Sequence, residues 1–400
     1  MSDIDPHELP LSGITVVEFC SIAAGPFCGM LLADLGADVV KIEAPGEGDP
    51  IRHAGAKVEG LSWYFAAFNR NKRSVALDLR TPEGREMLAQ LLERADVLVE
   101  NFRPGVLAGM GFDDARLHAL NPRLVVASIN GYGASGPYAE RPAFDFVIQA
   151  MSGFMSVNGE PAGPPLRSGL PITDLVAGLY AAFGIVNALH ARTRTGRGQR
   201  VEAAMMNGII SMFAYLASDY LATGAPPARC GNDHPITAPY GLFRTADGAI
   251  AVAPSTEAIL RRFLRELTLE HVLDDARFRT NSLRMRNRAE LDALINAQLQ
   301  QDGQENWVRR LNAAGVPCGL VQDIGQALSD PQVLQQEMVM EVEHPGHGPV
   351  RMLGFPVKLS ATPCQLRHPA PPHGGHTRQV LREWGIPGET APQPRPVPTG

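Results

Sequence analysis

The chain of 400 residues has few cysteines and lacks the motifs of most metal and phosphate-loop enzymes. It has only five cysteines, none in a C-x-x-C pair, and the odd number argues against a disulfide framework. No H-E-x-x-H spacing is present, so we predict no metal site. The G-x-S-x-G elbow and the G-x-x-x-x-G-K-[ST] loop are also missing, which excludes two further enzyme classes. We expect reduced thiols in a cytoplasmic protein.

Excess positive charge and long apolar runs are missing as well. The net charge of -6 gives no general attraction for nucleic acid or an anionic membrane, and neither is expected as a partner. Residues 1–10 are acidic and polar, without the apolar centre of a secretory signal. The longest apolar stretches, Leu175–Leu189 and Ala203–Ala217, are shorter than the ~20 residues that span a bilayer, so we expect buried core helices.

The first part of the chain alternates apolar strands with helices. Strands are expected at Ile14–Phe19, Asp38–Glu43, Arg73–Leu79, Asp96–Glu100 and Leu124–Ile129. Helices are expected at Phe27–Leu35 and at 81–94, where Thr81 is an N-cap and Pro82 occupies the first position. Continuous apolar strands between helices are typical of a parallel sheet covered on both faces. We therefore predict an α/β fold of Rossmann-like architecture.

The second half of the chain changes character after residue 225. Long helices are expected at Thr173–Thr193 and about Ala204–Ala222. A hairpin is expected over 241–253, and helical patterns follow it. We take 226–325 as a smaller α+β domain and 386–400 as a loose proline-rich tail.

A glycine-rich loop at 131–136 satisfies G-x-G-x-x-G, which taken alone suggests dinucleotide binding. It follows the fifth strand rather than the first, however, and Pro137 and Pro142 prevent a helix from starting there. We interpret it as a loop at the carboxyl end of a strand, and such loops line ligand crevices in α/β sheets.

Asp174 stands just after Thr173 at the start of a predicted helix. Aspartate is common there for capping, and the local pattern favours this structural interpretation. In the functional alternative, peptide N–H groups keep the carboxylate ionised so that it can act as a nucleophile. Small and turn residues at 167–173 leave the acid accessible. Basic residues at 69–73, Arg80 and Arg103 form either a solvated face or a phosphate pocket.

Several segments together resemble one family, the class III CoA-transferases, which include formyl-CoA transferase and carnitine CoA-transferase (CaiB/BaiF-like). The matching segments, in the order of that family, are Leu11–Phe19, Ala24–Pro26, Leu35–Glu43, Asn71–Ser74, Leu77–Leu79, Val99–Gly105, Ala127–Gly133, Asp174–Gly178 and Thr195–Gln199. Each segment is weak alone, whereas the ordered set over 11–385 is specific.

The resemblance implies a large Rossmann-like CoA-binding domain over 1–225, completed by 326–385, and a homodimer of interlocked chains. It places the catalytic aspartate on Asp174 and a second acid near the reacting carbonyl on Asp145. It places CoA contacts on Ala23, Ala24, Leu77, Asp78, Leu79, Arg80, Asn101, Phe102 and Arg103. Two basic CoA contacts of the family fall on Ala44 and Gly109, and Arg52 or Arg80 would have to compensate.

The activity that the resemblance implies is CoA transfer between carboxylic acids through an aspartyl-CoA thioester, with acyl-CoA as substrate and no permanently bound cofactor. Gly131 and Gly133 are candidates for oxyanion donors. The related 2-methylacyl-CoA racemases, a rival interpretation, carry a proton-shuttling histidine where this chain has Phe144. A non-catalytic CoA-binding protein is the third interpretation.

The segment around His234, Gly231–Tyr240, resembles members that act on short dicarboxylates, often with succinyl-CoA as donor. His234 is equally a candidate for a structural role. A free substrate carboxylate needs a cation, for which Arg52, Arg141 and Arg167 are candidates.

Overall fold

The computed structural model describes residues 8–58 and 60–387. It divides into two compact units, the first built from residues up to 154, 167–224 and from 334 onward, the second from 155–166 and 225–333. Most of the predicted loose tail, residues 388–400, lies outside the described residues.

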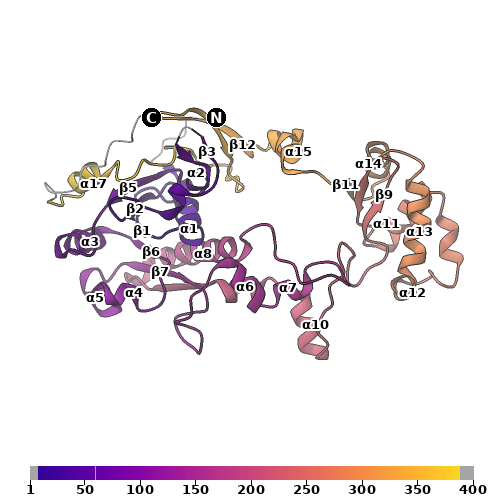
Figure 1. Cartoon of the computed structure of the whole chain (residues 1–400), viewed down its shortest axis with the longest axis horizontal. Coiled ribbons are helices and arrows are strands. Elements are labelled where there is room, and N and C mark those ends of the chain that lie inside the picture. Colours follow the sequence, from indigo (N-terminus) through magenta and orange to yellow (C-terminus); the bar gives the residue numbers. More distant parts are fainter. Residues whose placement is uncertain (1–7, 59, 388–400) are drawn as a thin grey trace. The chain divides into compact units, whose positions relative to one another are not determined.

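Six strands form the main sheet of the first unit, and every neighbouring pair is parallel. In spatial order they are β5 (Lys72–Ala76), β2 (Asp38–Glu43), β1 (Thr15–Phe19), β6 (Val97–Glu100), β7 (Val125–Asn130) and β8 (Arg200–Ala204). The chain builds outward from β1 through β2 to β5 and then restarts on the other side of β1 with β6 (Figure 1). This order is that of a Rossmann sheet. The predicted α/β fold with a parallel sheet is confirmed.

Helices cover both faces of this sheet. On one face, α1 (Ala24–Asp34), α8 (Ile172–Thr195) and α9 (Met205–Ser211) share a core with Val97 and Val125. On the other, α3 (Pro82–Arg94), α5 (Asp114–Leu120) and α17 (Thr377–Glu383) share a core with Leu98 and Val126. Successive strand residues point to opposite faces. A strand covered on both sides must therefore be apolar throughout, which is the pattern that the sequence shows.

Two segments differ from the sequence prediction. The helix expected over 204–222 is divided into α9 and α10 (Tyr215–Thr223), because the backbone turns at Ala214, where φ is 46°. The segment before α9 forms β8, a strand that we did not predict. β8 lies at the edge of the sheet, and its first residues are at least partly exposed, so it lacks the continuous apolar run of the inner strands.

Helix α8 is 24 residues long, longer than the predicted 173–193. Within the described part of the chain, it alone is long and apolar enough to cross a membrane, with a mean hydropathy of 1.6 over its best window. Half of that window is buried inside the protein, and core helices pass the same test, so a single such helix is weak support for a membrane span.

A buried cluster of charges links β1 to β2 and β5. Glu18 on β1 forms ion pairs with Lys41 on β2 at 3.0 Å and with Lys72 on β5 at 2.7 Å, and all three side chains are fully buried. Lys41 also contacts Asp49 at 2.9 Å and donates to the carbonyl of Cys20 at 2.8 Å. Because buried charges have lost their hydration, removing one leaves the others uncompensated.

Shorter elements complete the first unit. They are the 3-10 helix η2 (Pro50–His53), the helices α2 (Trp63–Asn69), α4 (Val106–Gly109) and α6 (Asp145–Met151), and two hairpins, β3 (Lys57–Val58) with β4 (Leu61–Ser62) and β12 (Val339–His344) with β13 (Gly348–Leu353). The short helices α7 (Phe154–Val157) and α16 (Pro331–Gln335) lie where the chain passes from one unit to the other.

The second unit has its own core around a small antiparallel sheet in the order β11-β10-β9. Its elements are β9 (Gly241–Arg244), β10 (Ala249–Val252), α11 (Glu257–Glu266), η3 (Glu270–Asp274), α12 (Asn281–Arg286), α13 (Arg288–Leu299), α14 (Gln304–Ala313), β11 (Cys318–Leu320) and α15 (Ile324–Ser329). The strands β9 and β10 form the hairpin that the sequence predicts.

We expect Gly29→Ala to lower the stability of the first unit. A Cβ at this position of α1 would lie 1.9 Å from the Glu18 carboxylate, which its ion pairs hold in place. The free energy of unfolding should fall by about 2 to 4 kcal/mol in chemical denaturation. Gly109→Ala is the control, because a Cβ there meets nothing within 4 Å among the described residues. Equal stability of the two variants would contradict the prediction.

Candidate functional site

The carboxyl ends of β1 and β6 mark the point at which the order of strands reverses. In open α/β sheets, ligands bind in the crevice outside such a point. Ala23 and Ala24 follow β1, and the segment 101–103 follows β6. All of these residues belong to the set to which the resemblance assigns CoA contacts, and the fold brings them to the same end of the sheet.

Asn101 links the segment after β6 to the loop after β1. Its side-chain amide donates to the carbonyl of Ser21 at 2.9 Å, and the Ser21 amide donates back to its oxygen at 3.1 Å. The next residue, Ile22, has a φ of 70°, and its amide donates to the buried Asp49 carboxylate at 3.2 Å. A β-branched residue rarely adopts this conformation. The loop after β1 is therefore held in a fixed, strained shape by its neighbours.

Asp174 lies in the first turn of α8, and this helix packs closely on α1. A Cβ on Gly178 would lie 2.6 Å from the carbonyl oxygen of Ala24, so the missing side chain permits the close approach. Residues four apart lie on the same side of a helix. The face of α8 that meets the start of α1 is therefore the face that carries Asp174, one turn earlier.

Asp145 is the first residue of α6, and its side chain contacts the start of α8. Its Oδ1 accepts hydrogen bonds from the backbone amide and from the hydroxyl of Thr173, both at 2.9 Å. Its Oδ2 accepts from the Nε2 of Gln149 at 2.7 Å. All of these partners are donors, and they hold the carboxylate in a fixed position at the start of α8. The structure thus brings together the acids that the resemblance selected, Asp145 and Asp174.

The Asp174 carboxyl is in an unfavourable place for charge. Burial, and after it the negative charge of Asp145, raises the pKa of Asp174 from its ordinary value of 3.8 to about 7. No described residue donates a hydrogen bond to its side chain. The functional alternative assumed that peptide N–H groups at the helix start keep Asp174 ionised, but its pKa is raised and the amide of Thr173 donates to Asp145 instead.

Tyr64 on α2 is a residue of this region that the sequence did not reveal. Burial raises the pKa of its hydroxyl, and the charges of nearby carboxylates, foremost Asp174, raise it further. An aromatic residue in an apolar helix resembles any core residue, so no sequence signal distinguishes it. It places a hydroxyl within electrostatic range of the acid pair.

The segment 77–80 follows the end of β5, whereas the sequence placed 77–79 within that strand, and its polar groups pair with one another. Leu77 is buried, and its amide continues the sheet by donating to Glu43. Arg80 contacts Asp78 through two hydrogen bonds of 2.8 Å, both on the exposed surface. A phosphate would have to compete with Asp78 for this guanidinium.

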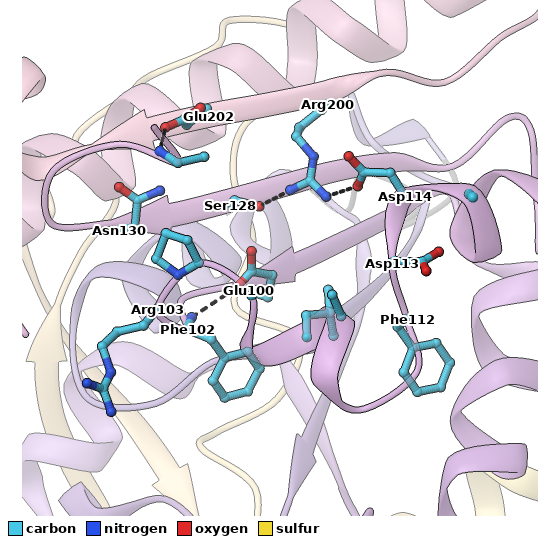
Figure 2. A pocket seen from close by; sticks show the side chains of 16 residues that line it. Glu100, Phe102, Arg103, Phe112, Asp113, Asp114, Ser128, Asn130, Arg200 and Glu202 are labelled. Atoms are coloured by element: carbon cyan, nitrogen blue, oxygen red, sulfur yellow. Dashed lines mark hydrogen bonds and ion pairs between the residues drawn. The ribbon is translucent and has the colours of Figure 1, made fainter. Parts of the chain in front are cut away.

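Phe102 and Arg103 also line a cavity of about 530 Å³ (Figure 2). Phe102 packs edge-on against Phe19 at 4.5 Å between ring centres. Glu100, which points into the cavity, accepts from the amide of Phe102 at 2.8 Å, and Arg200 pairs with Asp114 across it. Burial raises the pKa of Glu100. Because neither Asp174 nor Asp145 lines this cavity, it is distinct from the acid pair.

The glycine-rich loop after β7 has structural roles in packing and hydrogen bonding. A Cβ on Gly131 would lie 2.3 Å from that of Ala143, so only glycine fits there. Gly133 has a φ of 103°, and its amide donates to the side chain of Asn130 at 2.6 Å. The next amide, that of Ala134, donates to Glu202. The amides of Gly133 and Ala134 already donate hydrogen bonds to these side chains, so we assign them no oxyanion role.

His234 belongs to the second unit, where its ring contacts Tyr240 at 4.7 Å between centroids. Among the cations considered for a substrate carboxylate, Arg52 is already paired with Glu43 at 2.7 Å. Burial alone would raise the pKa of Glu43, but the hydrogen bonds and charge of Arg52 outweigh it and lower the pKa to about 2. Arg141 lies over the ring of Tyr138, and Arg167 is exposed just before 168–171.

The fold and the site define an α/β protein of Rossmann topology with an acid pair beside its switch point. The chain belongs to CoA-transferase family III, whose model matches residues 11–377, and it is a CoA-transferase. It is 37% identical to a succinate–glutarate CoA-transferase of Agrobacterium fabrum, over 96% of this chain and 98% of that protein. The human succinyl-CoA:glutarate CoA-transferase is 34% identical, over 94% and 86%.

A solved structure supports the same assignment. A CaiB/BaiF family protein from Brucella suis has a TM-score of 0.84 and 38% identity, covering 94% of this chain and 99% of that one. The resemblance noted in the sequence is thereby confirmed.

We expect Asp174→Asn to stabilise the protein at about pH 8 but not at about pH 4. The raised pKa means that the folded state binds the proton more tightly than the unfolded chain, so stability falls as pH rises from about 4 to about 7. The variant escapes this loss, which is on the order of 2 to 4 kcal/mol. Chemical denaturation at both pH values measures it. Asp219→Asn, at an exposed position, is the control. A gain independent of pH would contradict the prediction.

Proposed function

We propose that the enzyme transfers CoA from an acyl-CoA to a carboxylic acid through a thioester on Asp174. The observation that carries this proposal is the position of Asp174, at the start of α8 beside the switch point, with no described hydrogen-bond partner for its carboxyl. A carboxylate that is desolvated and not hydrogen-bonded is a stronger nucleophile than a solvated one. A pKa of about 7 leaves a large ionised fraction at neutral pH and retains basicity.

The proposed reaction conserves the thioester energy. The Asp174 carboxylate attacks the thioester carbonyl of the donor, the carbon–sulfur bond breaks, and a mixed anhydride and CoA thiolate form. The thiolate then attacks the Asp174 carbonyl, releasing the donor acid and leaving aspartyl-CoA. The acceptor carboxylate attacks this thioester, and the same steps run in reverse to yield the new acyl-CoA and free Asp174. Each intermediate is sensitive to hydrolysis, so the site must exclude water.

For the substrates we propose a short dicarboxylate acceptor and succinyl-CoA as donor. Relatives at 34–37% identity are named succinate–glutarate CoA-transferase, succinyl-CoA–D-citramalate CoA-transferase and succinyl-CoA:glutarate CoA-transferase. The distal carboxylate of such an acid needs a cation. Arg52 is neutralised by Glu43, so Arg141 and Arg167 are the better candidates.

The rival racemase function would need a proton donor at the position where racemases carry histidine, and this chain has none there. Phe144, which stands where those enzymes carry histidine, is the N-cap of α6, and its side chain is 67% exposed. A phenyl ring carries no titratable proton. CoA transfer is therefore the function that the residues present support.

We also propose that two chains associate in the cytoplasm. Apolar side chains on α8 and α10 are exposed, including Leu179 at 53%, Phe183 at 66% and Leu221 at 82%. Exposed apolar patches mark interaction surfaces. The free thiols of all five cysteines fit a reducing compartment.

Asp174→Ala should abolish CoA transfer while CoA binding persists. We expect kcat to fall by on the order of a thousandfold or more, because no other group replaces the nucleophile. The assay combines succinyl-CoA with glutarate and follows both CoA esters by mass spectrometry. In the wild type, succinyl-CoA should also leave a CoA adduct on the peptide that contains Asp174. Retained turnover in the variant would overturn the proposal.

Phe183→Asp should convert the proposed dimer to monomers. A charge placed on the exposed face of α8 cannot be desolvated at an apolar interface. Light scattering without detergent measures the mass, and Arg116→Asp, at an exposed position of α5 on the other face of the sheet, is the control. A wild type that is monomeric would contradict the association, and one that requires detergent would point to a membrane instead.

A further inference from the structure

Gln149 is a fully buried amide that the proposed chemistry has not used. It lies on α6, one helical turn after Asp145, and donates from Nε2 to the Oδ2 of that acid at 2.7 Å. On its other side, its Oε1 accepts from the backbone amide of Ser168 at 2.7 Å. It therefore bridges the second acid of the site and the segment that leads into α8.

This bridge extends a series of hydrogen bonds that runs from Ser168 through Gln149 and Asp145 to Thr173 at the start of α8. Asp145 accepts from Gln149 on one oxygen and from Thr173 on the other. Gln149 and Thr173 are each 0% exposed, and Asp145 is 8% exposed. Buried polar groups that are fully satisfied rigidify their surroundings, and a missing partner is costly.

We propose that Gln149 is a positioning residue that holds the Asp145 side chain beside the start of α8 and fastens the segment 168–170 next to Asp174. The inference rests on the proposed role of Asp174 as nucleophile. Gln149 itself contacts no reacting atom. Its amide donates to Asp145, and the charge of Asp145 acts on Asp174, second to burial.

The charged and titratable groups around this pair come from three helices and one loop. Asp145 on α6 is the charge that acts on Asp174. Tyr64 on α2 responds to Asp174, to Asp145 and to Asp49, which lies just before η2. A like charge held nearby raises the pKa of a carboxyl group. By fixing the position of Asp145, Gln149 therefore contributes to the raised pKa of Asp174.

Gln149→Leu and Gln149→Glu test this role in different ways. Leucine removes the hydrogen bonds of the Gln149 side chain, so Asp145 is no longer held beside Asp174 and its charge acts less on that acid. The acid limb of the kcat/KM profile should then move to lower pH, with kcat reduced at least about tenfold and KM for the acyl-CoA little changed. Glutamate keeps the acceptor for Ser168. While protonated it also donates to Asp145, so its activity should exceed that of Gln149→Leu until the new carboxyl ionises, which adds an alkaline limb.

Gln90→Glu is the matched control. Gln90 on α3 donates to Glu86, also four residues earlier, at 3.2 Å, but on an exposed surface over the other face of the sheet. It introduces the same charge in the same local geometry and should keep the wild-type pH profile. Absence of a new alkaline limb in Gln149→Glu, or the same limb in Gln90→Glu, would overturn the inference. Should Gln149→Leu fail to fold in a melting experiment, Gln149→Glu decides alone.

A measurement without turnover separates this inference from the proposed function. Carbodiimide labelling of Asp174, read on its peptide by mass spectrometry, follows the protonated carboxyl as pH changes. The labelling midpoint should move to lower pH in Gln149→Leu. If wild type transfers no CoA, the proposed function fails, whereas an unchanged midpoint refutes the positioning role of Gln149 by itself.

Discussion

The buried carboxylate of Glu18 joins three strands of the parallel sheet, β1, β2 and β5. It pairs with Lys41 and Lys72, and Lys41 extends the network to Asp49 and to the carbonyl of Cys20. That network ends at the strained loop after β1. Charges buried this deeply have no water to replace a missing partner, so the cluster has a single arrangement. The loop after β1 is therefore held rigidly as well. Helix α1 can pass close to the cluster only because Gly29 has no side chain there.

A second electrostatic constraint operates where α8 begins. The amide and hydroxyl of Thr173 serve Asp145 rather than Asp174. Two adjacent acids consequently differ in environment, one surrounded by donors and one desolvated. Pairs of acids whose environments differ in this way are common at catalytic sites. The desolvated acid costs stability at neutral pH, as functional sites commonly do, and the rest of the fold must offset that cost.

The sequence predicted the inner strands and the long helix α8 well, because continuous apolar runs and helix-start residues report local preferences. It missed β8, whose exposed edge lacks an apolar run, and it joined α9 to α10 across Ala214, where no glycine or proline signals a turn. For the site, the ordered family segments selected Asp174 and Asp145. Tyr64 and Gln149 escaped because an aromatic or an amide in a helix has no distinctive spacing.

The sequence by itself therefore determined the α/β class, the family and the identity of the acid proposed to react. Only the tertiary structure decided how that acid behaves, because its proton affinity depends on groups far away in the chain: Asp145 and the packing around it. It also decided which groups already have partners. Arg52 forms an ion pair with Glu43, and the amide of Gly133 donates a hydrogen bond to Asn130. Sequence patterns record what each segment prefers, whereas charge and desolvation arise only where segments meet.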